Sequence, residues 1–506
     1  MTWQRILFGV YLFGLVLITV YSLFQAHLLI HYYRWVRKRD RLIAPPIPEG
    51  APDLPYVTVQ IALYNERTVA AQVIDAVARF EWPPDRLEIQ VLDDSTDETA
   101  RIVSDKVEEW RAKGLDIKAL RRQERAGFKA GALAAGTEAA RGDYIAIFDA
   151  DFLPSPDFLR RMMPYFEDPS VGIVQGRWGH LNLRHSFITR MQAILLDGFY
   201  HVEQPGRAFA AYLIRFNGSG GILRKACIED AGGWSGETLA EDLDLCFRAQ
   251  LGGWKIHYAH DVVAEAELPL SLDDFKEQQF RWTKGKAQVL RKLNGRLFRA
   301  RLPRLVKAHA YADICNIFVY LAAFICTVLS VPLAWIVYGT GTFPDYIIDT
   351  SFGLISLFIW MHFVAVVLGY HMEGKVRRAW AFAWLFPGTL MTLLGIMFYQ
   401  TVALFQGFFG GPGEFVRTPK RGAQGVASGY RSSHPLAVTV IESLFTLYFG
   451  AALWMDYQIG AVAFVPLHVA LMAGYAFVAG YSLVARVGAW VGAARAEEKP
   501  SPLQAA

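Results

Sequence analysis

The chain has 506 residues, of which 53% are hydrophobic and 19% charged, and its mean hydropathy is +0.22. This length exceeds one ordinary core, so we expect at least two structural units. The net charge of +4 is small, and basic residues gather beside long uncharged runs. That pattern argues against nucleic-acid binding and favours contact with a membrane surface. The sequence therefore predicts an integral membrane protein with one large soluble domain.

Residues 6–30 carry no Asp, Glu, Lys or Arg and are long enough to span a bilayer core of about 30 Å. The run lacks the short apolar core and small-residue cleavage site of a signal peptide. A basic cluster follows it: Arg34, Arg37, Lys38, Arg39 and Arg41. Such clusters stay on the cytosolic side, so we expect the soluble domain in the cytosol. The cysteines show no metal-site spacing and are predicted to be reduced packing residues: Cys227, Cys246, Cys315 and Cys326.

After a Pro-rich linker at residues 44–55, strand and helix patterns alternate. We predict strands at 57–63, at 87–92 and ending at Asp149, and helices at 66–80, 98–113 and 131–140. Such alternation is typical of a mostly parallel sheet with right-handed crossovers, a Rossmann-like architecture. No G-x-G-x-x-G follows the first strand, which argues against a dinucleotide cofactor and against a dehydrogenase.

Acidic side chains follow two of the predicted strands. Asp93 and Asp94 end one strand, and Asp149 and Asp151 follow another, whose residues have β-branched and aromatic character. The carboxyl ends of such strands face the ligand crevice of α/β proteins. Neighbouring carboxylates repel each other, so we expect a divalent cation between them and a diphosphate. Taken alone, the D-x-D motif is equally consistent with an Asp-rich turn that caps the next helix.

Three further motifs carry candidate site residues. The glycine-rich turn at 216–221 would let backbone approach a ligand closely, although a plain loop is the alternative. Asp242 opens a predicted helix, where N-capping alone could explain one acid. Gln278, Arg281 and Trp282 lie within one helical turn and suit a diphosphate clamp with a sugar-stacking face. Interfacial anchoring is the alternative for the Arg and the Trp.

The rest of the chain is organised around the membrane. Residues 285–307 are basic and amphipathic and predict an interfacial helix on the cytoplasmic leaflet. Residues 379–409 are apolar but basic at both ends, so we expect this run to lie in the cytoplasmic interface. With residues 6–30, the other apolar runs make five predicted spans: 311–338, 352–370, 436–453 and 460–485. We divide the chain as follows: 1–43 helix and basic flank, 44–284 soluble domain, 285–310 interfacial helix, 311–371 two spans, 372–435 interfacial helix and loop, 436–487 two spans, 488–506 cytosolic tail.

The order Asp-Asp, D-x-D, Glu-Asp and Q-x-x-R-W resembles family 2 processive glycosyltransferases, the cellulose and hyaluronan synthase group. The match looks tighter to plant cellulose synthase-like A and C proteins and their bacterial relatives. The phrases that carry it are Gln90-Val91-Leu92-Asp93-Asp94-Ser95, Phe128-Lys129-Ala130-Gly131-Ala132-Leu133, Ile147-Phe148-Asp149-Ala150-Asp151-Phe152, Phe216-Asn217-Gly218 and residues 229–234. The resemblance is strong over residues 55–295 and weak over the membrane part.

This resemblance implies a cytosolic GT-A (Rossmann-like) α/β domain inserted between transmembrane helices, with amphipathic interfacial helices. It implies that Asp149 and Asp151 hold Mg²⁺ or Mn²⁺ and that Asp242, with Glu241 beside it, is the general base. The implied donor-binding residues are Tyr64, Asn65, Glu66, Asp93, Asp94, Lys129, Gln278 and Arg281. The implied acceptor-binding residues are Trp282, Asn217, Gly218 and Ser219. One base and no covalent nucleophile imply a single displacement with inversion.

Two positions depart from the family pattern. Ala240 stands where Thr often precedes Glu-Asp, so one hydroxyl contact is missing. The gating loop of related synthases reads F-x-V-T-x-K, and here Phe415, Thr418 and Lys420 match it while Arg417 replaces the Val. The resemblance therefore implies a lid over the site, with an imperfect motif.

As function, the resemblance implies an inverting hexosyltransferase that polymerises a β-1,4-linked hexan (mannan, glucomannan or glucan) from GDP-mannose or UDP-glucose and exports it. Its partners would be the nucleotide-sugar donor, a growing glycan or glycolipid acceptor, the lipid bilayer and a periplasmic or cell-wall export partner, with no nucleic acid. The implied location is the cell inner membrane, as a multi-pass protein with a cytosolic catalytic domain. The nearest alternative adds one or a few sugars to a membrane lipid. A second alternative is a scaffold or transporter that merely binds a nucleotide-sugar.

Overall fold

The computed structural model describes residues 2–341, 379–411, 413 and 435–497, together with positions 353, 354, 357, 361 and 364. The predicted span at 352–370 lies largely outside this set. The predicted gating-loop residues Phe415, Thr418 and Lys420 lie wholly outside it.

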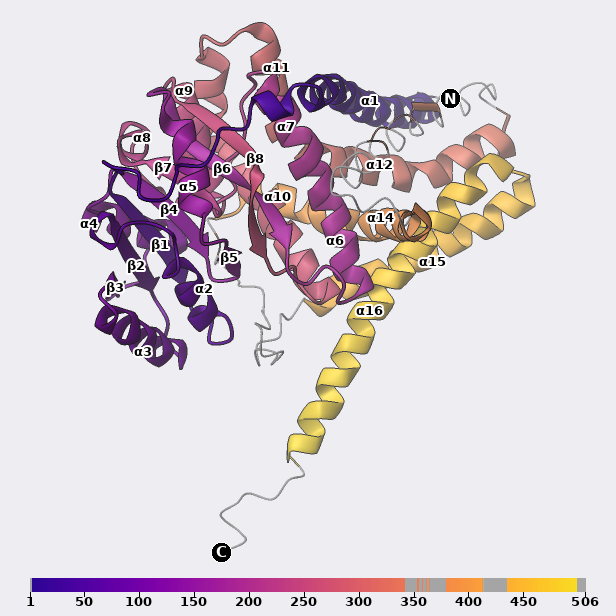
Figure 1. The fold of residues 1–506 in the computed structure, drawn as a ribbon. Helices are drawn as coiled ribbons and strands as arrows, with labels where there is room; N and C mark the ends of the chain where they lie inside the picture. The colour runs from indigo at the N-terminus through magenta and orange to yellow at the C-terminus, as the bar shows by residue number, and fades with distance from the viewer. Residues whose placement is uncertain are drawn as a thin grey trace, which may run out of the picture.

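The soluble domain is built on one eight-stranded mixed sheet within residues 57–266 (Figure 1). In spatial order the strands are β3, β2, β1, β4, β7, β6, β8 and β5. Their bounds are β1 Val57–Leu63, β2 Leu87–Asp93, β3 Asp116–Leu120, β4 Tyr144–Asp149, β5 Phe152–Pro154, β6 Val171–His180, β7 Gly221–Arg224 and β8 Lys255–Ala266. The three strands predicted from the sequence are confirmed.

The two halves of the sheet differ in strand direction. In the first half β1 pairs in parallel with β2 and β4, and β2 pairs in parallel with β3, as the alternating pattern predicts. In the second half β7 runs antiparallel to β4 and β6, and β5 runs antiparallel to β8. Because β7 begins at Gly221 opposite Ile147, the glycine-rich turn before it lies beside the carboxyl end of β4.

Strand β4 shows how the sheet is held between two cores. Ala146 and Phe148 point into one buried cluster, whereas Ile145 and Ile147 point into the other. This alternation is the two-residue period of a strand buried on both faces. The predicted helices are confirmed as α2 Ala70–Val77, α3 Thr99–Ala112 and α4 Phe128–Ala139. Helices α2 and α3 cover the first face and α4 the second, which leaves the carboxyl ends of β1, β2 and β4 accessible.

The helix after the sheet, α10 Leu272–Arg299, is continuous over 28 residues. The predicted boundary at residue 285 therefore falls inside a helix. Beyond that point, Val289, Leu293 and Leu297 are buried in the same cluster as Phe247 of the soluble domain. The apolar face that predicted contact with a membrane surface is thus covered by protein, and a second helix, α11 Arg304–Ile314, follows.

In the described part of the chain, five helices are long and apolar enough to cross a membrane. They are α1 Thr2–Val36, α12 Ile317–Ala334 with its extension to Gly339, α14 Ala379–Phe409, α15 Leu436–Ile459 and α16 Val465–Glu497. They lie to one side of the sheet (Figure 1), which fits a membrane protein with a soluble domain. Helix α14 packs against α10, α12 and α16, so its interfacial placement stays a prediction.

Helices α10 and α14 approach each other closely at Gly407 of α14. A Cβ atom at Gly407 of α14 would lie 2.6 Å from the carbonyl oxygen of Lys284 on α10. Nearby, the Thr283 hydroxyl donates to Oε1 of Gln400 over 2.6 Å. The helix that carries Gln278, Arg281 and Trp282 is therefore in direct contact with the apolar helices.

A buried ion pair also joins α10 to α15. Nζ of Lys276 lies 2.7 Å from Oε1 of Glu442, and both side chains are fully inaccessible to solvent. Breaking such a pair leaves one buried charge uncompensated, whereas replacing both partners by apolar residues removes both desolvation costs.

We therefore expect Glu442→Gln to destabilise the protein by about 3–5 kcal/mol, and Lys276→Met/Glu442→Leu to cost much less. The measurement is thermal unfolding of the purified protein in detergent. A double variant no more stable than Glu442→Gln would contradict this account of the pair.

Candidate active site

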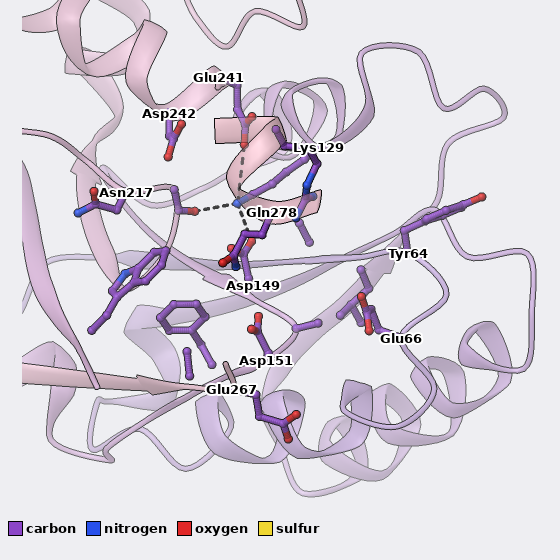
Figure 2. Close-up of a pocket in the computed structure, with 18 of the residues that line it drawn as sticks. Tyr64, Glu66, Lys129, Asp149, Asp151, Asn217, Glu241, Asp242, Glu267 and Gln278 are labelled. Atoms are coloured by element: carbon purple, nitrogen blue, oxygen red, sulfur yellow. Dashed lines mark hydrogen bonds and ion pairs between the residues drawn. The ribbon is translucent and has the colours of Figure 1, made fainter. Parts of the chain in front are cut away.

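A pocket opens at the carboxyl ends of β1, β2 and β4 and is closed from the other side by α10 (Figure 2). Most of the site residues predicted from the sequence line it: Tyr64, Glu66, Asp94, Lys129, Asp149, Asp151, Asn217, Gly218, Glu241, Asp242, Gln278, Arg281 and Trp282. They come from segments more than 200 residues apart, brought together by the sheet, by α9 Glu241–Leu251 and by α10. Asn65, Asp93 and Ser219 do not line the pocket.

Lys129, on the second residue of α4, lies at the centre of the pocket. Its Nζ is 2.5 Å from Oδ1 of Asp149 and 3.8 Å from Oε1 of Glu241, and it donates to the carbonyl oxygen of Gly218 over 2.9 Å (Figure 2). Burial by itself would lower the pKa of Lys129, but the charges of Asp149 and Glu241 outweigh it and raise that pKa. The ammonium group therefore stays charged and holds three site segments together.

Glu241 and Asp242 begin α9, so their carboxyl groups lie at a helix N-terminus. Oδ1 of Asp242 accepts a hydrogen bond from the Leu243 backbone N–H over 2.7 Å. Burial raises the pKa of Asp242, and it raises the pKa of Glu241 to about 7 although Lys129 acts in the opposite direction. A carboxylate with a raised pKa is a stronger base than an exposed one, which suits proton abstraction from a hydroxyl.

The residue before this pair, Ala240, lies against α10. A Cβ atom at Gly285 would lie 2.9 Å from the Cβ of Ala240. The small side chains let α10 approach the start of α9 closely, and this contact occupies the place where the family often has a threonine.

Gly218 lies between Asp242 and Lys129 in a backbone conformation with φ of +79°, which side chains rarely tolerate. A Cβ there would lie 2.9 Å from Oδ2 of Asp242 and 3.4 Å from Nζ of Lys129. Gly233 has a similar φ of +74°, but a Cβ at that position would meet nothing within 4 Å.

This contrast gives a matched prediction. Gly218→Ala and Gly233→Ala should each cost about 1–2 kcal/mol of stability through backbone strain. Only Gly218→Ala should also lower turnover, by about 100-fold, because it displaces Asp242 and Lys129. Turnover and melting temperature of both variants test this, and equal loss of turnover in the two would contradict it.

The three predicted residues outside the pocket support it from behind. The Ser219 hydroxyl accepts a hydrogen bond from the Asp149 backbone N–H over 2.9 Å. Asp93 accepts from Nε of Arg121 over 3.0 Å and from the Ser95 backbone N–H over 3.1 Å. The Asn65 side chain accepts from the Thr96 backbone N–H over 2.8 Å, which joins the loops after β1 and β2.

Residues 52–285 match the family described as "Glycosyltransferase like family 2". Over these residues, which make up less than half of the chain, the sequence is similar to family 2 glycosyltransferases. This finding confirms the family that the motif order predicts.

Two curated plant proteins are similar to about half of this chain. The chain is 39% identical over 274 residues to glucomannan 4-beta-mannosyltransferase 7 of Arabidopsis thaliana, a match covering 53% of this chain and 48% of that protein. It is 41% identical over 282 residues to glucomannan 4-beta-mannosyltransferase 2 of the same plant, covering 54% and 53%. The chain thus spans about half the length of these relatives.

Among solved structures, the mannosyltransferase PcManGT from Pyrobaculum calidifontis, in complex with GDP-Man and Mn²⁺, matches with a TM-score of 0.53 and 20% identity. The match covers 80% of this chain and 99% of that one. At this identity the likeness concerns the fold, and it confirms the predicted GT-A architecture.

Other pocket residues of the glycosyltransferase domain were not predicted from the sequence. The Arg125 guanidinium lies 3.4 Å from the centre of the Tyr64 ring, a cation–π contact at the pocket wall. Arg122 binds both carboxylate oxygens of Asp94, over 3.1 and 2.5 Å. Both arginines follow β3 at the same sheet edge as the acids. Their position after a strand was the sequence signal that could have identified them as candidate site residues. Trp178, His180 and Glu267 also line the pocket.

The carboxylates in the pocket fit a divalent cation whose remaining coordination positions are filled by oxygen atoms of a bound ligand. In the described residues no group of three or more His, Cys, Asp or Glu side chains is arranged around a metal position. Asp149 and Asp151 instead offer two carboxylates in the pocket, and Asp149 already contacts the ammonium group of Lys129. Two carboxylates plus diphosphate oxygens are a donor set that Mg²⁺ and Mn²⁺ accept.

Proposed function

We propose that this chain is a membrane-embedded, inverting glycosyltransferase that builds a β-1,4-linked hexan from GDP-mannose or UDP-glucose. The observation that carries the proposal is the convergence of Asp149, Lys129 and Asp242 in one pocket beside Gln278, Arg281 and Trp282. The names of the plant relatives, which are glucomannan 4-beta-mannosyltransferases, support mannose as a donor sugar and a 1,4-linkage.

In this proposal each residue has a separate task. Lys129, Gln278 and Arg281 bind the donor diphosphate with two positive charges and one amide. Asp149 and Asp151 would hold Mg²⁺ or Mn²⁺, which neutralises charge on the departing nucleoside diphosphate. Support for a metal comes from PcManGT, whose structure contains GDP-Man and Mn²⁺.

Asp242 accepts the proton of the acceptor hydroxyl while that oxygen attacks the anomeric carbon. Its raised pKa makes it a better base, and Lys129 limits the repulsion between its charge and those of Asp149 and Glu241. Trp282 provides a flat face for the acceptor sugar. A single displacement inverts an α-linked donor to a β-linked product.

The membrane part of the proposal rests on the apolar helices. The catalytic domain would lie in the cytosol, where its donors are made, and the spans would carry the product across the cell inner membrane to an export partner. Phe415, Thr418 and Lys420 would form a lid. In support, Gly413 lies against Lys284 and near Leu239, and Leu239 lines the pocket.

The test offers GDP-mannose, UDP-glucose and UDP-N-acetylglucosamine separately to the purified protein in liposomes, with Mg²⁺ or Mn²⁺. We expect a high-molecular-weight product that is cut by a β-1,4-mannanase or a cellulase. A short, lipid-extractable product would instead establish the glycolipid alternative. Binding of donor without any transfer would favour the scaffold or transporter class and overturn the proposal.

A further inference from the structure

His180, the last residue of β6, lines the pocket and has no role in the proposed reaction. Its side chain is only 3% exposed. Nε2 of His180 lies 2.9 Å from Oδ1 of Asp197, whose side chain is 2% exposed and is carried by α6 Phe187–Gly198. A histidine that is buried on a pocket wall and tied to a buried carboxylate is held in one orientation.

The carboxylate also determines which ring nitrogen carries the proton. A carboxylate oxygen accepts, so Nε2 of His180 donates to Asp197, and the neutral ring then has its lone pair on Nδ1. Within the part of the chain that the structure describes, Nδ1 of His180 has no hydrogen-bond partner. The pocket wall therefore presents one oriented acceptor atom to a ligand.

The neighbouring His201 approaches Oδ1 of Asp197 only to 4.0 Å, beyond hydrogen-bond distance. Nη1 of Arg177 donates to Nε2 of His201 over 3.1 Å, so the proton of His201 lies on Nδ1 and is donated to Nε2 of His260 over 3.0 Å. Nε2 of His201 is 4.0 Å from Asp197 and, being an acceptor, does not donate to it. These contacts fix the surroundings of the His180–Asp197 pair.

The sheet places His180 away from the metal and diphosphate part of the pocket. His180 pairs with Ala266 of β8, and Ala266 pairs with Phe152 of β5, the residue after Asp151. Two strand spacings of about 4.8 Å separate the His180 backbone from that of Phe152 by about 10 Å. This distance suits a sugar ring beyond the diphosphate, and the pocket lining includes the aromatic or apolar residues Phe152, Trp178, Leu196 and Leu268 together with Glu267.

We infer that His180, oriented by Asp197, accepts a hydrogen bond from one hydroxyl of a hexose bound in the pocket and thereby selects among hexoses. The inference rests on the proposed function. The hexose is either the transferred sugar of the donor or the terminal sugar of the acceptor, since both carry the same chemistry. Asp197 is a positioning residue that acts through His180.

The test pairs variants with substrates that lack one hydroxyl. Donors deoxygenated in turn at C2, C3, C4 and C6 form one arm, and acceptor oligosaccharides deoxygenated on their terminal residue form the other. In the parent enzyme, loss of one particular hydroxyl should lower kcat/KM by about 10- to 100-fold. In His180→Phe, removal of the same hydroxyl should lower kcat/KM by less than about 3-fold. If this difference is seen with the deoxygenated donors, His180 binds the donor sugar; if it is seen with the deoxygenated acceptors, it binds the acceptor sugar.

Two further variants separate recognition from folding. Asn places a polar atom near the position of Nδ1, so His180→Asn should restore part of the selectivity that His180→Phe loses. Asp197→Asn should weaken selectivity while changing KM more than kcat. His185→Phe, at an exposed position just beyond β6, is the matched control and should leave selectivity unchanged.

The outcomes distinguish the inference from the function on which it rests. Failure of the parent enzyme to transfer any hexose would overturn the proposed function. A parent enzyme that works, with His180→Phe slowing all natural and deoxygenated substrates by the same factor, would overturn the inference alone. Melting temperatures of all variants exclude loss of folding as the cause.

Discussion

Replacing Asp242 by Asn is expected to reduce turnover by about 10²–10⁴-fold while leaving donor affinity nearly unchanged. The amide keeps the shape of the carboxyl group beside Gly218 but cannot take a proton from the acceptor hydroxyl. Steady-state kinetics and donor binding by calorimetry, both on purified protein in detergent, measure the two effects. Normal turnover in Asp242→Asn would show that Asp242 is not the general base.

The same residue predicts the pH dependence. Because burial raises the pKa of Asp242, the base loses its charge at a higher pH than an ordinary aspartate. The value of kcat/KM should therefore fall as the pH decreases through a midpoint above the usual carboxylate range. Glu237→Gln, which removes an exposed carboxylate from the loop before α9, is the control and should leave the profile unchanged.

Asp149→Asn is expected to lower turnover by about 100-fold or more and to raise the concentration of Mg²⁺ or Mn²⁺ needed for half-maximal rate. Chelation by EDTA should stop the parent enzyme, and added metal should restore it. The variant also lacks the 2.5 Å ion pair between Asp149 and Lys129. Its donor affinity, measured in the absence of metal, should therefore differ from that of the parent enzyme.

The matched control lies at the other end of the same strand. Asp143 is exposed and directly precedes β4, and Asp143→Asn should retain the parent metal dependence. An enzyme that works fully in EDTA, or an Asp149→Asn variant with an unchanged metal requirement, would contradict the assignment of this carboxylate.

Strands β1, β2 and β4 could be predicted because their residues form mostly apolar runs of six or seven residues, whereas the five-residue β3 beside them was not predicted. Strand β4 is an apolar run of β-branched and aromatic residues that ends in two acids, and such a run has few alternatives. The second half was not predicted. Strands β7 and β5 have four and three residues, too few to show a period, and the longer β6 and β8 carry Gly, Arg, His or Asp among their apolar residues.

Candidate site residues could be predicted from the sequence where they belong to a motif. Lys129, Asp149 and Asp242 belong to the motifs that the sequence shows, and the structure places them in one pocket. Arg125 lines the pocket, and Arg122 binds the pocket residue Asp94, because β3 ends at the same sheet edge. His180 reaches the pocket because β6 pairs with β8, and neither relation is visible as a spacing along the chain.

The basic, amphipathic pattern of residues 285–307 illustrates a different limit. Its apolar positions would suit a lipid headgroup region or a protein surface equally well, since both accept an apolar stripe. In the structure Val289, Leu293 and Leu297 pack on the soluble domain. Periodicity identifies a buried face without identifying what buries it.

Because α14 is one of the five helices long and apolar enough to cross a membrane, we expect its close contact with the Lys284 backbone of α10 to link catalysis to the thickness of the bilayer. Apolar helices tilt when the hydrocarbon layer becomes thinner, at a cost of fractions of a kcal/mol per Å of mismatch. Because the two helices are packed this closely, we expect α10 to follow α14 and to move Gln278, Arg281 and Trp282 with it. Acyl-chain length should therefore act on this enzyme as a modulator of rate, with a maximum in the membrane whose thickness its helices match.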